Sequence, residues 1–324
     1  MAKITLIEAV NQAMHQEMSQ DKSVVLIGED VGIGGVFRAT DGLRDKFGPA
    51  RVFDSPLAES GIIGTAVGMA ANGLRPIAEI QFNAFTMMGL HQLKNHAGKI
   101  RMRSRGRFTC PMVLRTPYGG GTRPLEEHSD SLDAIYSHIA GIKAVVPSTP
   151  YDAKGLLISA IRDPDPVVFL EPTKLYRTVK EEVPDEIYTV PIGKAKVVSE
   201  GKDLTLISWG GMMKQTQEAA DAVQEHGISA EVIDIRSICP LDIDTIFSSV
   251  KKTGRVVIVH EDHRSCGLGA EIIAELSENM LTDLIAPPQR VTGFDVPFPM
   301  YKLEDYFMPS VNRVVSAINK VMQF

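Results

Sequence analysis

Short runs rich in β-branched residues alternate along the chain with stretches long enough for amphipathic helices. In the first half, the runs predict strands at 23–28, 75–80, 112–116, 142–147 and 167–170. Between these runs, helices are predicted at 6–19, 61–72, 86–104 and 151–162. Strands that alternate with helices are typical of parallel sheets whose crossover helices cover the sheet faces. We therefore expect an α/β fold with a parallel sheet.

The pattern stops at residues 180–191, an acidic stretch with two prolines and no periodicity, and then restarts. The second half is predicted to contain strands at 204–209, 230–235, 256–260 and 290–292, with helices at 214–225, 243–250, 270–277 and 311–322. A chain of 324 residues is also long enough for two cores. We place one domain at 1–185, a linker at 186–200 and a smaller α/β domain at 201–324.

Composition excludes several classes of protein. The net charge of −6 argues against nucleic acid as the main partner. There is no run of about 18 apolar residues that would predict a membrane span. Three widely spaced cysteines without a Cys-x-x-Cys pair do not support a zinc or iron–sulfur site. The first residues lack the apolar region of a signal peptide, which predicts a cytoplasmic protein, or one of an organelle matrix if a transit peptide was removed.

The first strand is not followed by a nucleotide-binding loop. A dinucleotide-binding protein would have the motif Gly-x-Gly-x-x-Gly directly after this strand. This chain has Gly28-Glu29-Asp30-Val31-Gly32 instead. The sequence therefore does not predict a nicotinamide cofactor.

The most informative segment is Pro56-Leu57-Ala58-Glu59-Ser60-Gly61, which leads into a helix of small and apolar residues. Glu59 could be an acid at a helix N-terminus, stabilised by the helix dipole. It could instead be a buried carboxylate that shares a proton in catalysis, because burial raises carboxylate pKa values. Position alone leaves both interpretations open.

Five segments, in this order along the chain, resemble motifs of one enzyme family. They are 56–61, Glu79-Ile80-Gln81-Phe82, His128-Ser129-Asp130-Ser131, 146–157 and 293–299. They resemble the beta subunits of thiamine-diphosphate-dependent 2-oxo acid dehydrogenases that act on pyruvate or branched-chain substrates. The resemblance implies a transketolase-like pyrimidine-binding domain followed by a smaller transketolase C-terminal-like domain.

The resemblance also implies roles for single residues. Glu59 would hydrogen-bond the pyrimidine nitrogen of thiamine diphosphate and activate its aminopyrimidine ring. Phe85 would stack on that ring, and Leu57 and Gln81 would contact it. His128 would act in catalysis by guiding acyl transfer to the lipoyl group, although on the residues alone it could equally be a surface-loop histidine.

A structural potassium ion is a further implication of the resemblance. Its ligands would be oxygen atoms of Met112, Ala160, Ile161, Asp163 and Asp165, which suit a hard cation. Other members carry Asn where this chain has Asp165, and an ordinary turn is the alternative.

The resemblance implies that the chain is inactive alone. No Gly-Asp-Gly sequence occurs here, although this begins the family's motif for diphosphate and Mg²⁺. An alpha subunit would supply both sites, in an α2β2 heterotetramer. The second domain, including the run His260-Glu261-Asp262-His263, is expected to contact other subunits and the lipoyl acyltransferase core rather than to bind a metal.

The function expected is oxidative decarboxylation of a 2-oxo acid and reductive acylation of the lipoyl group. The motifs slightly favour branched-chain or broad substrates, with pyruvate close behind. The alternatives are an acetoin-cleaving or transketolase-like subunit and a noncatalytic scaffold; the presence of both Glu59 and His128 argues against the scaffold.

Overall fold

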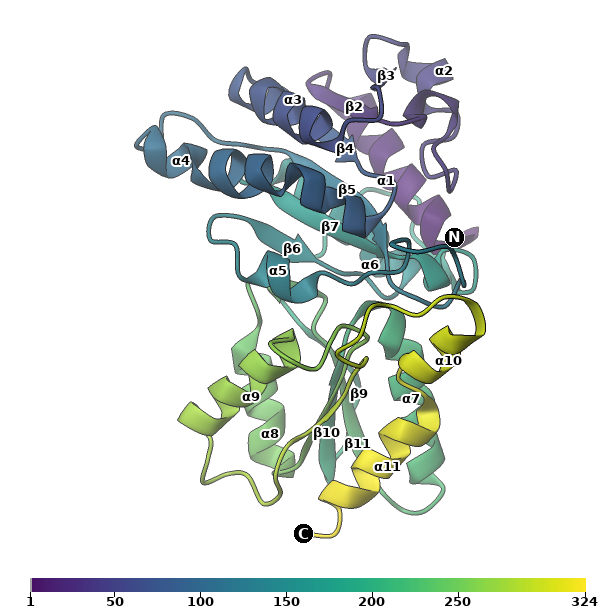
Figure 1. Cartoon of the computed structure of the whole chain (residues 1–324), viewed down its shortest axis with the longest axis vertical. Helices are drawn as coiled ribbons and strands as arrows, with labels where there is room; N and C mark the ends of the chain where they lie inside the picture. Colours follow the sequence, from purple (N-terminus) through teal and green to yellow (C-terminus); the bar gives the residue numbers. More distant parts are fainter. Residues whose placement is uncertain (1) are drawn as a thin grey trace. The chain divides into compact units, whose positions relative to one another are not determined.

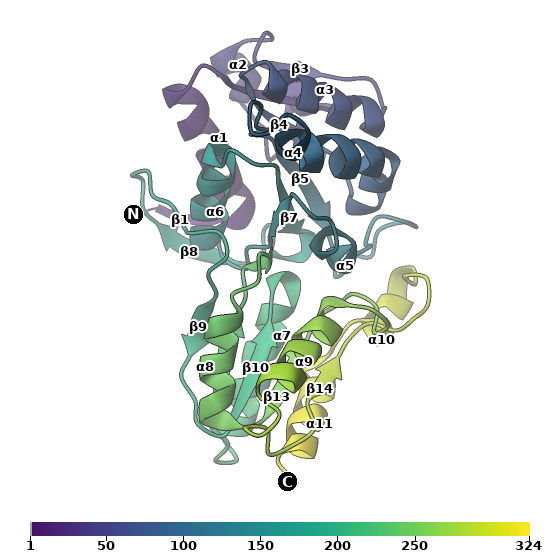
Figure 2. The same cartoon turned by 90° about the vertical axis from the view of Figure 1, so that its left-hand side faces the viewer.

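The computed structural model describes residues 2–324, which form two compact α/β units (Figures 1 and 2). Unit 1 comprises the chain up to Tyr118 together with Ile135–Ile192, and unit 2 comprises Gly119–Ala134 and Gly193–Phe324. The last change of unit therefore falls inside the stretch 186–200 that the sequence suggested as a linker. Among residues 2–324, no helix is long and apolar enough to cross a membrane.

Unit 1 is built on a parallel sheet, as the sequence predicted. Its strands lie in the order β6-β7-β5-β4-β2-β3, and every pair is parallel. The strands are β2 (Val24–Gly28), β3 (Val52–Asp54), β4 (Arg75–Glu79), β5 (Val113–Tyr118), β6 (Lys143–Val145) and β7 (Val167–Pro172). Only the three-residue β3 was not predicted, because a run that short carries no periodicity.

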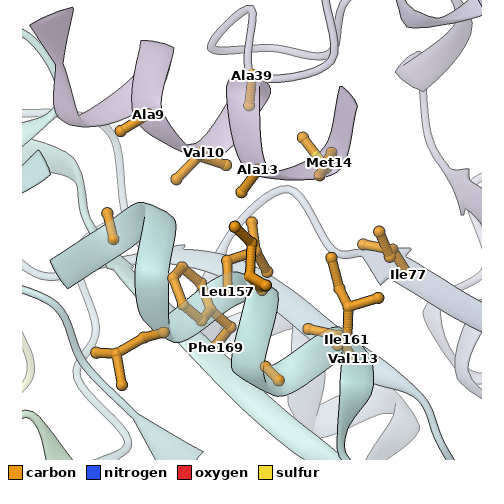
Figure 3. Packing of buried hydrophobic residues seen from close by; sticks show 14 of the residues in the cluster. Ala9, Val10, Ala13, Met14, Ala39, Ile77, Val113, Leu157, Ile161 and Phe169 are labelled. Carbon is orange, nitrogen blue, oxygen red and sulfur yellow. The ribbon is translucent and has the colours of Figure 1, made fainter. Parts of the chain in front are cut away.

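Two long helices cover one face of this sheet, α1 (Leu6–Gln20) and α6 (Pro150–Arg162). Helix α1 begins with a capping box, in which Thr5 and Glu8 satisfy each other's backbone N–H groups. Figure 3 shows Val10 and Ala13 of α1 pointing toward Leu157 of α6. These residues are buried in the main core of unit 1. The two helices therefore pack together against one face of the sheet.

The other face of the sheet carries α3 (Glu59–Ala71) and an irregular helical segment. Gly73 follows the end of α3 with a φ of +92°, a left-handed conformation that glycine adopts readily. The stretch predicted as one helix at 86–104 is helical in the structure over residues 83–103, but its winding changes along the way. The chain instead forms a 3₁₀ segment η2 (Asn83–Gly89), a π segment η3 (Gln92–His96), a 3₁₀ turn η4 (Ala97–Lys99) and the short α4 (Ile100–Arg103).

Close backbone packing accounts for this change of winding. A Cβ on Gly98 would lie 3.0 Å from the carbonyl oxygen of Ala140, and one on Gly141 would meet the backbone of Gly98. The amphipathic pattern predicts that this stretch is helical, but these contacts between distant residues change the type of helix.

Residues 180–191, interpreted as part of a linker, are also partly regular. Strand β8 (Lys180–Val183) pairs antiparallel with β1 (Ala2–Thr5), and Thr5 lies opposite Lys180. The prediction failed because β8 is a short edge strand with exposed charged side chains. Remaining helical elements in the first 192 residues are η1 (Val31–Ile33), α2 (Leu43–Phe47), α5 (Asp133–Ser137) and η5 (Thr173–Leu175).

Unit 2 is built on a five-stranded sheet in the order β14-β13-β10-β11-β9. Only the edge strand β9 is antiparallel to its neighbour. The strands are β9 (Lys196–Ser199), β10 (Leu204–Ser208), β11 (Ala230–Asp234), β12 (Ser237–Cys239, outside this sheet), β13 (Val256–Val259) and β14 (Gln289–Val291). Its helical elements are η6 (Gly210–Met212), α7 (Met213–Gln224), α8 (Ile243–Thr253), α9 (Leu268–Asn279), η7 (Tyr301–Leu303), α10 (Glu304–Phe307) and α11 (Val311–Val321).

Candidate active site

The proposed cofactor residues follow β3 and β4, the two strands on either side of β2 in unit 1. In the parallel register, Asp54 of β3, Gly28 of β2 and Glu79 of β4 lie side by side at the carboxyl ends of their strands. Leu57 and Glu59 follow the first of these strands, and Gln81 and Phe85 follow the third. The carboxyl edge of a parallel sheet is where ligands bind in α/β proteins. The structure therefore brings these four residues to one edge of unit 1.

Glu59 is the first residue of α3, two residues earlier than the sequence indicated. Its side chain is half-buried, and the preceding residue Ala58 provides no side-chain cap. Segment η2 packs against this end of the helix, since a Cβ on Gly89 would lie only 3.2 Å from the carbonyl oxygen of Glu59. Gly89 thus permits a close backbone contact that fixes η2 beside the Glu59 turn.

Glu29 is a second carboxylate at this edge, directly after β2, and the sequence analysis missed it. It is 7% exposed, and its Oε1 has no hydrogen-bond partner among residues 2–324. Burial, and then the charge of nearby Glu59, raises the pKa of Glu29. Its place after the first strand was the available signal, but its burial depends on contacts that a sequence does not display.

Phe85 belongs to a row of aromatic rings in unit 1. Its ring centroid lies 5.9 Å from that of Phe82, Phe82 lies 5.6 Å from Phe37, and Phe37 lies 5.2 Å from Tyr176. Phe85 is half-buried, so part of its ring is accessible. Leu57 is 80% exposed and offers an apolar surface at the same edge of the sheet.

A buried ion cluster lies in the strands beneath this edge. Arg115 of β5 contacts Glu171 of β7 at two points, with Nε to Oε1 at 2.6 Å and Nη2 to Oε2 at 2.9 Å. Its Nη1 also donates to Glu79 of β4 at 2.6 Å, and the Tyr176 hydroxyl donates to Glu171 at 2.5 Å. Burial, only partly offset by Arg115, raises the pKa of Glu79. The cluster ties together the ends of three strands, two of which lead into site segments.

His128 lies in unit 2, in the segment 119–134. Its side chain is half-buried, and its Nδ1 lies 2.6 Å from the carbonyl oxygen of Glu126. A ring nitrogen at this distance from a carbonyl oxygen carries a proton, so this contact orients the imidazole ring.

Acidic side chains hold the segment 119–134 to the rest of unit 2. Gly120 N donates to Glu261 at 2.7 Å, and Gly121 N donates to Glu304 at 2.6 Å. Trp209 Nε1 donates to the buried Asp133 at 2.6 Å. The loop that carries His128 is therefore fixed at both ends by contacts within one unit.

The side chains of the run at 260–263 make contacts within unit 2, and the interface role expected from the sequence stays a prediction. Among residues 2–324, no group of three His, Cys, Asp or Glu side chains could hold a metal ion. His260 stacks on Trp209 with 5.2 Å between centroids, while Glu261 binds Gly120. Burial lowers the pKa of His260 to about 3.

The expected potassium ligands lie together at the end of α6, but cationic side chains already contact them. Arg75 donates to the carbonyl oxygen of Ile161 at 2.9 Å, Lys143 binds the Asp163 carboxylate at 2.6 Å, and Arg101 binds Asp165 at 2.6 Å. The two remaining carbonyl oxygens also accept hydrogen bonds. Asp163 N donates to the carbonyl oxygen of Ala160, and Val167 N donates to the carbonyl oxygen of Met112. Each carbonyl oxygen that accepts one hydrogen bond keeps a second lone pair, so the potassium site stays a prediction beside the ordinary turn.

Both units match known families. Residues 2–179 match the family described as "Transketolase, pyrimidine binding domain", and residues 193–314 match "Transketolase, C-terminal domain". The chain also resembles a solved structure titled "Split gene transketolase, inactive beta4 tetramer", with a TM-score of 0.81, 24% identity and 99% of each chain covered. Fold and site together define a transketolase-type pair of domains.

Curated relatives give the closer assignment. The chain is 53% identical to the "Pyruvate dehydrogenase E1 component subunit beta" of Acholeplasma laidlawii, covering 99% of this chain and 98% of the relative. It is 49% identical to the protein of the same name from Bacillus subtilis over the full length of both. The chain therefore belongs to the beta subunits of the thiamine-diphosphate-dependent 2-oxo acid dehydrogenases.

Proposed function

We propose that this chain is the beta subunit of a pyruvate dehydrogenase component, which decarboxylates pyruvate and transfers the acyl group to a lipoyl group. The observation that carries the proposal is the edge of unit 1, where Glu59, Glu29 and Phe85 follow neighbouring strands in a chain about half identical to pyruvate enzymes. The expected preference for branched-chain substrates has no support in these relatives, whose names specify pyruvate.

The residues at this edge fit the pyrimidine end of thiamine diphosphate. A carboxylate can hydrogen-bond a ring nitrogen, an accessible aromatic ring can stack on the pyrimidine, and Leu57 can cover it from water. The buried Oε1 of Glu29, which has no hydrogen-bond partner among residues 2–324, would be a further polar group at this edge. Thiamine diphosphate, when bound, supplies the nucleophilic carbon and the electron sink that decarboxylation of a 2-oxo acid requires.

Glu59 is the proton-handling residue in this proposal. Its carboxyl group would hold a proton between one oxygen and the pyrimidine nitrogen, and only a group that titrates can exchange that proton. Gln81 and Phe85 would orient the ring: Phe85 lies on η2, which Gly89 fixes beside α3, and Gln81 lies between β4 and η2. His128 would act on the acyl transfer, with its ring oriented by the contact between Nδ1 and the Glu126 carbonyl.

The chain is proposed to work only with an alpha subunit, in an α2β2 heterotetramer. The alpha subunit would hold the diphosphate end of the cofactor and its Mg²⁺, for which this sequence has no Gly-Asp-Gly motif. The lipoyl acyltransferase core would dock on unit 2. Exposed apolar side chains of residues 294–306 give unit 2 a surface suited to subunit contacts, namely Phe294, Val296, Met300, Tyr301, Leu303 and Tyr306.

The test is co-expression of this chain with its alpha subunit. Release of CO₂ is measured with pyruvate and with a branched 2-oxo acid, using each subunit alone and the purified complex. The proposal predicts activity only in the complex, with a higher kcat/KM for pyruvate. A higher kcat/KM for the branched substrate would overturn the substrate assignment, and full activity of this chain alone would overturn the shared site.

A further inference from the structure

A cavity in unit 1 lies away from the residues assigned to the cofactor. Its volume is about 540 Å³, within the usual range of small-molecule sites. It lies where α1 begins, beside β1 and β8, and the loop at 37–41 forms its other wall; Figure 2 shows β1, β8 and α1 side by side. The lining residues are Thr5, Ile7, Glu8, Asn11, Phe37, Arg38, Asp41, Arg177 and Lys180.

Three cationic side chains line this cavity, Arg38, Arg177 and Lys180, and all three are exposed. None forms an ion pair within 4.0 Å with a carboxylate anywhere in residues 2–324. Arg38 donates to the carbonyl oxygen of Ile33 at 2.6 Å, and Arg177 makes a long contact of 3.4 Å to that of Phe37. The backbone thus holds both guanidinium groups at the cavity while most of their donors stay available.

The two carboxylates of the cavity compensate these cations only in part. One oxygen of Glu8 accepts from both the backbone N–H and the hydroxyl of Thr5 at 2.7 Å, and these hydrogen bonds, followed by the charge of Lys180, lower its pKa. Asp41 lies beside Arg38 near Gly34, but beyond ion-pair distance. Arg177 is therefore the least compensated of the three cations.

Apolar side chains line another part of the cavity. Ile7 is buried, and Phe37 is half-buried with its ring packed against Phe82 and Tyr176. Asn11 is held rigidly, since its amide donates to the carbonyl oxygens of Ala39 and Asp41 at 2.9 and 3.0 Å. The cavity thus combines cationic side chains with an aromatic surface that is already ordered.

From this combination, we propose that the cavity binds a small phosphate-bearing molecule with a flat apolar part. The phosphate groups would lie between Arg177 and Lys180, with Arg38 beside them, because guanidinium groups bind phosphate oxygens at two points and lysine adds a compact charge. The flat part would pack on Phe37 and Ile7. Because Phe37 contacts Phe82, and Phe82 contacts Phe85, an occupant would adjoin the aromatic row that leads to the site edge.

The binding test uses isothermal titration of ADP, pyrophosphate, adenosine and citrate. Each is titrated into the full chain alone and into its complex with the alpha subunit, which is saturated beforehand with thiamine diphosphate and Mg²⁺ to fill the diphosphate site. The proposal predicts a Kd below about 1 mM for ADP, weaker binding of pyrophosphate, and none of adenosine. No binding of ADP to the complex, or citrate binding as tight as that of ADP, would overturn it.

Variants locate the bound molecule. The double variant Arg177→Met/Lys180→Met should weaken ADP binding at least about tenfold. Arg44→Met, which removes a half-exposed arginine of unit 1 outside the cavity, is the control and should bind as the unmodified chain does. Unchanged ADP binding in the double variant would place the phosphate elsewhere and reject the cavity. Because both replaced side chains are exposed, circular dichroism and melting temperature should match those of the control.

Discussion

Arg115 and Glu171 face each other inside unit 1 in a two-point ion pair, with almost no exposure of either side chain. Arg115 also binds Glu79, so that one cation serves two buried carboxylates. Both buried carboxylates therefore depend on Arg115 for their compensating positive charge, and both would lose it if Arg115 were replaced. A buried charge without a partner is among the most destabilising changes that a core can suffer.

Replacement of Arg115 by Met should lower the free energy of unfolding by roughly 3–5 kcal/mol near neutral pH. The loss should shrink as the pH falls, because protonation removes the charges that Arg115 balances. Urea unfolding at pH 8 and pH 5 measures both effects. The control is Arg44→Met, which breaks the half-exposed pair with Asp54 and should lose about 1 kcal/mol or less. Equal losses in the two variants would show that the buried cluster does not stabilise unit 1.

His260 should make unit 2 sensitive to acid. Burial lowers its pKa to about 3, whereas an unfolded histidine titrates near 6.5. The unfolded state therefore binds the extra proton between these values, so this residue's contribution to stability is present above pH 6.5 and is lost as the pH falls toward 3. The slope is at most about 1.4 kcal/mol per pH unit.

His260→Phe keeps a ring against Trp209 and removes this titration. Urea unfolding is measured at several pH values between 7.5 and 4.5. The free energy of unfolding should depend less steeply on pH in the variant than in the unmodified protein. The slope of the free energy of unfolding against pH distinguishes the two effects of the substitution, because a change in packing alone shifts this free energy equally at every pH. The exposed His226, replaced by Gln, is the control and should leave the slope unchanged. A variant as acid-sensitive as the unmodified protein would contradict the assignment to His260.

His128 is expected to matter more for acyl transfer than for decarboxylation. In the purified complex, His128→Ala should lower reductive acylation of a free lipoyl domain by about 100-fold, the usual effect of losing one proton-transfer group. Decarboxylation measured with an artificial electron acceptor should fall much less. The exposed His138, replaced by Ala, should affect neither rate. Equal loss of both activities in His128→Ala would refute this division of roles.

The regular parts of the fold were predictable because their signal is local. Strands such as Val24–Gly28 and Val256–Val259 are continuous apolar runs, and their expected limits differ from the observed ones by a residue or so. Strand β8 was missed because its exposed side chains, Lys180 and Glu182, carry no sign of the pairing with β1.

The site was predictable only in part, for the same reason. Glu59 and Phe85 lie in motifs that a sequence displays. Glu29 becomes notable only through its burial and its proximity to Glu59, which arise from the alignment of β2 with β3. Similarly, the loop that carries His128 is fixed by Glu261 and Glu304, more than 130 residues further along the chain.

The central claim is that the Glu59 carboxyl group handles a proton of the cofactor, and Glu59→Gln tests it most directly. Gln keeps the size and the hydrogen bonding of the side chain but cannot titrate. Glu8→Gln is the matched control, because Glu8 is also a first-turn glutamate and Gln can keep its capping box.

Both variants are assembled with the alpha subunit, and CO₂ release from pyruvate is measured at saturating thiamine diphosphate and Mg²⁺. The account predicts that Glu59→Gln lowers kcat by at least about 100-fold while Glu8→Gln retains full activity. A Glu59→Gln complex with the kcat of the unmodified enzyme would contradict it.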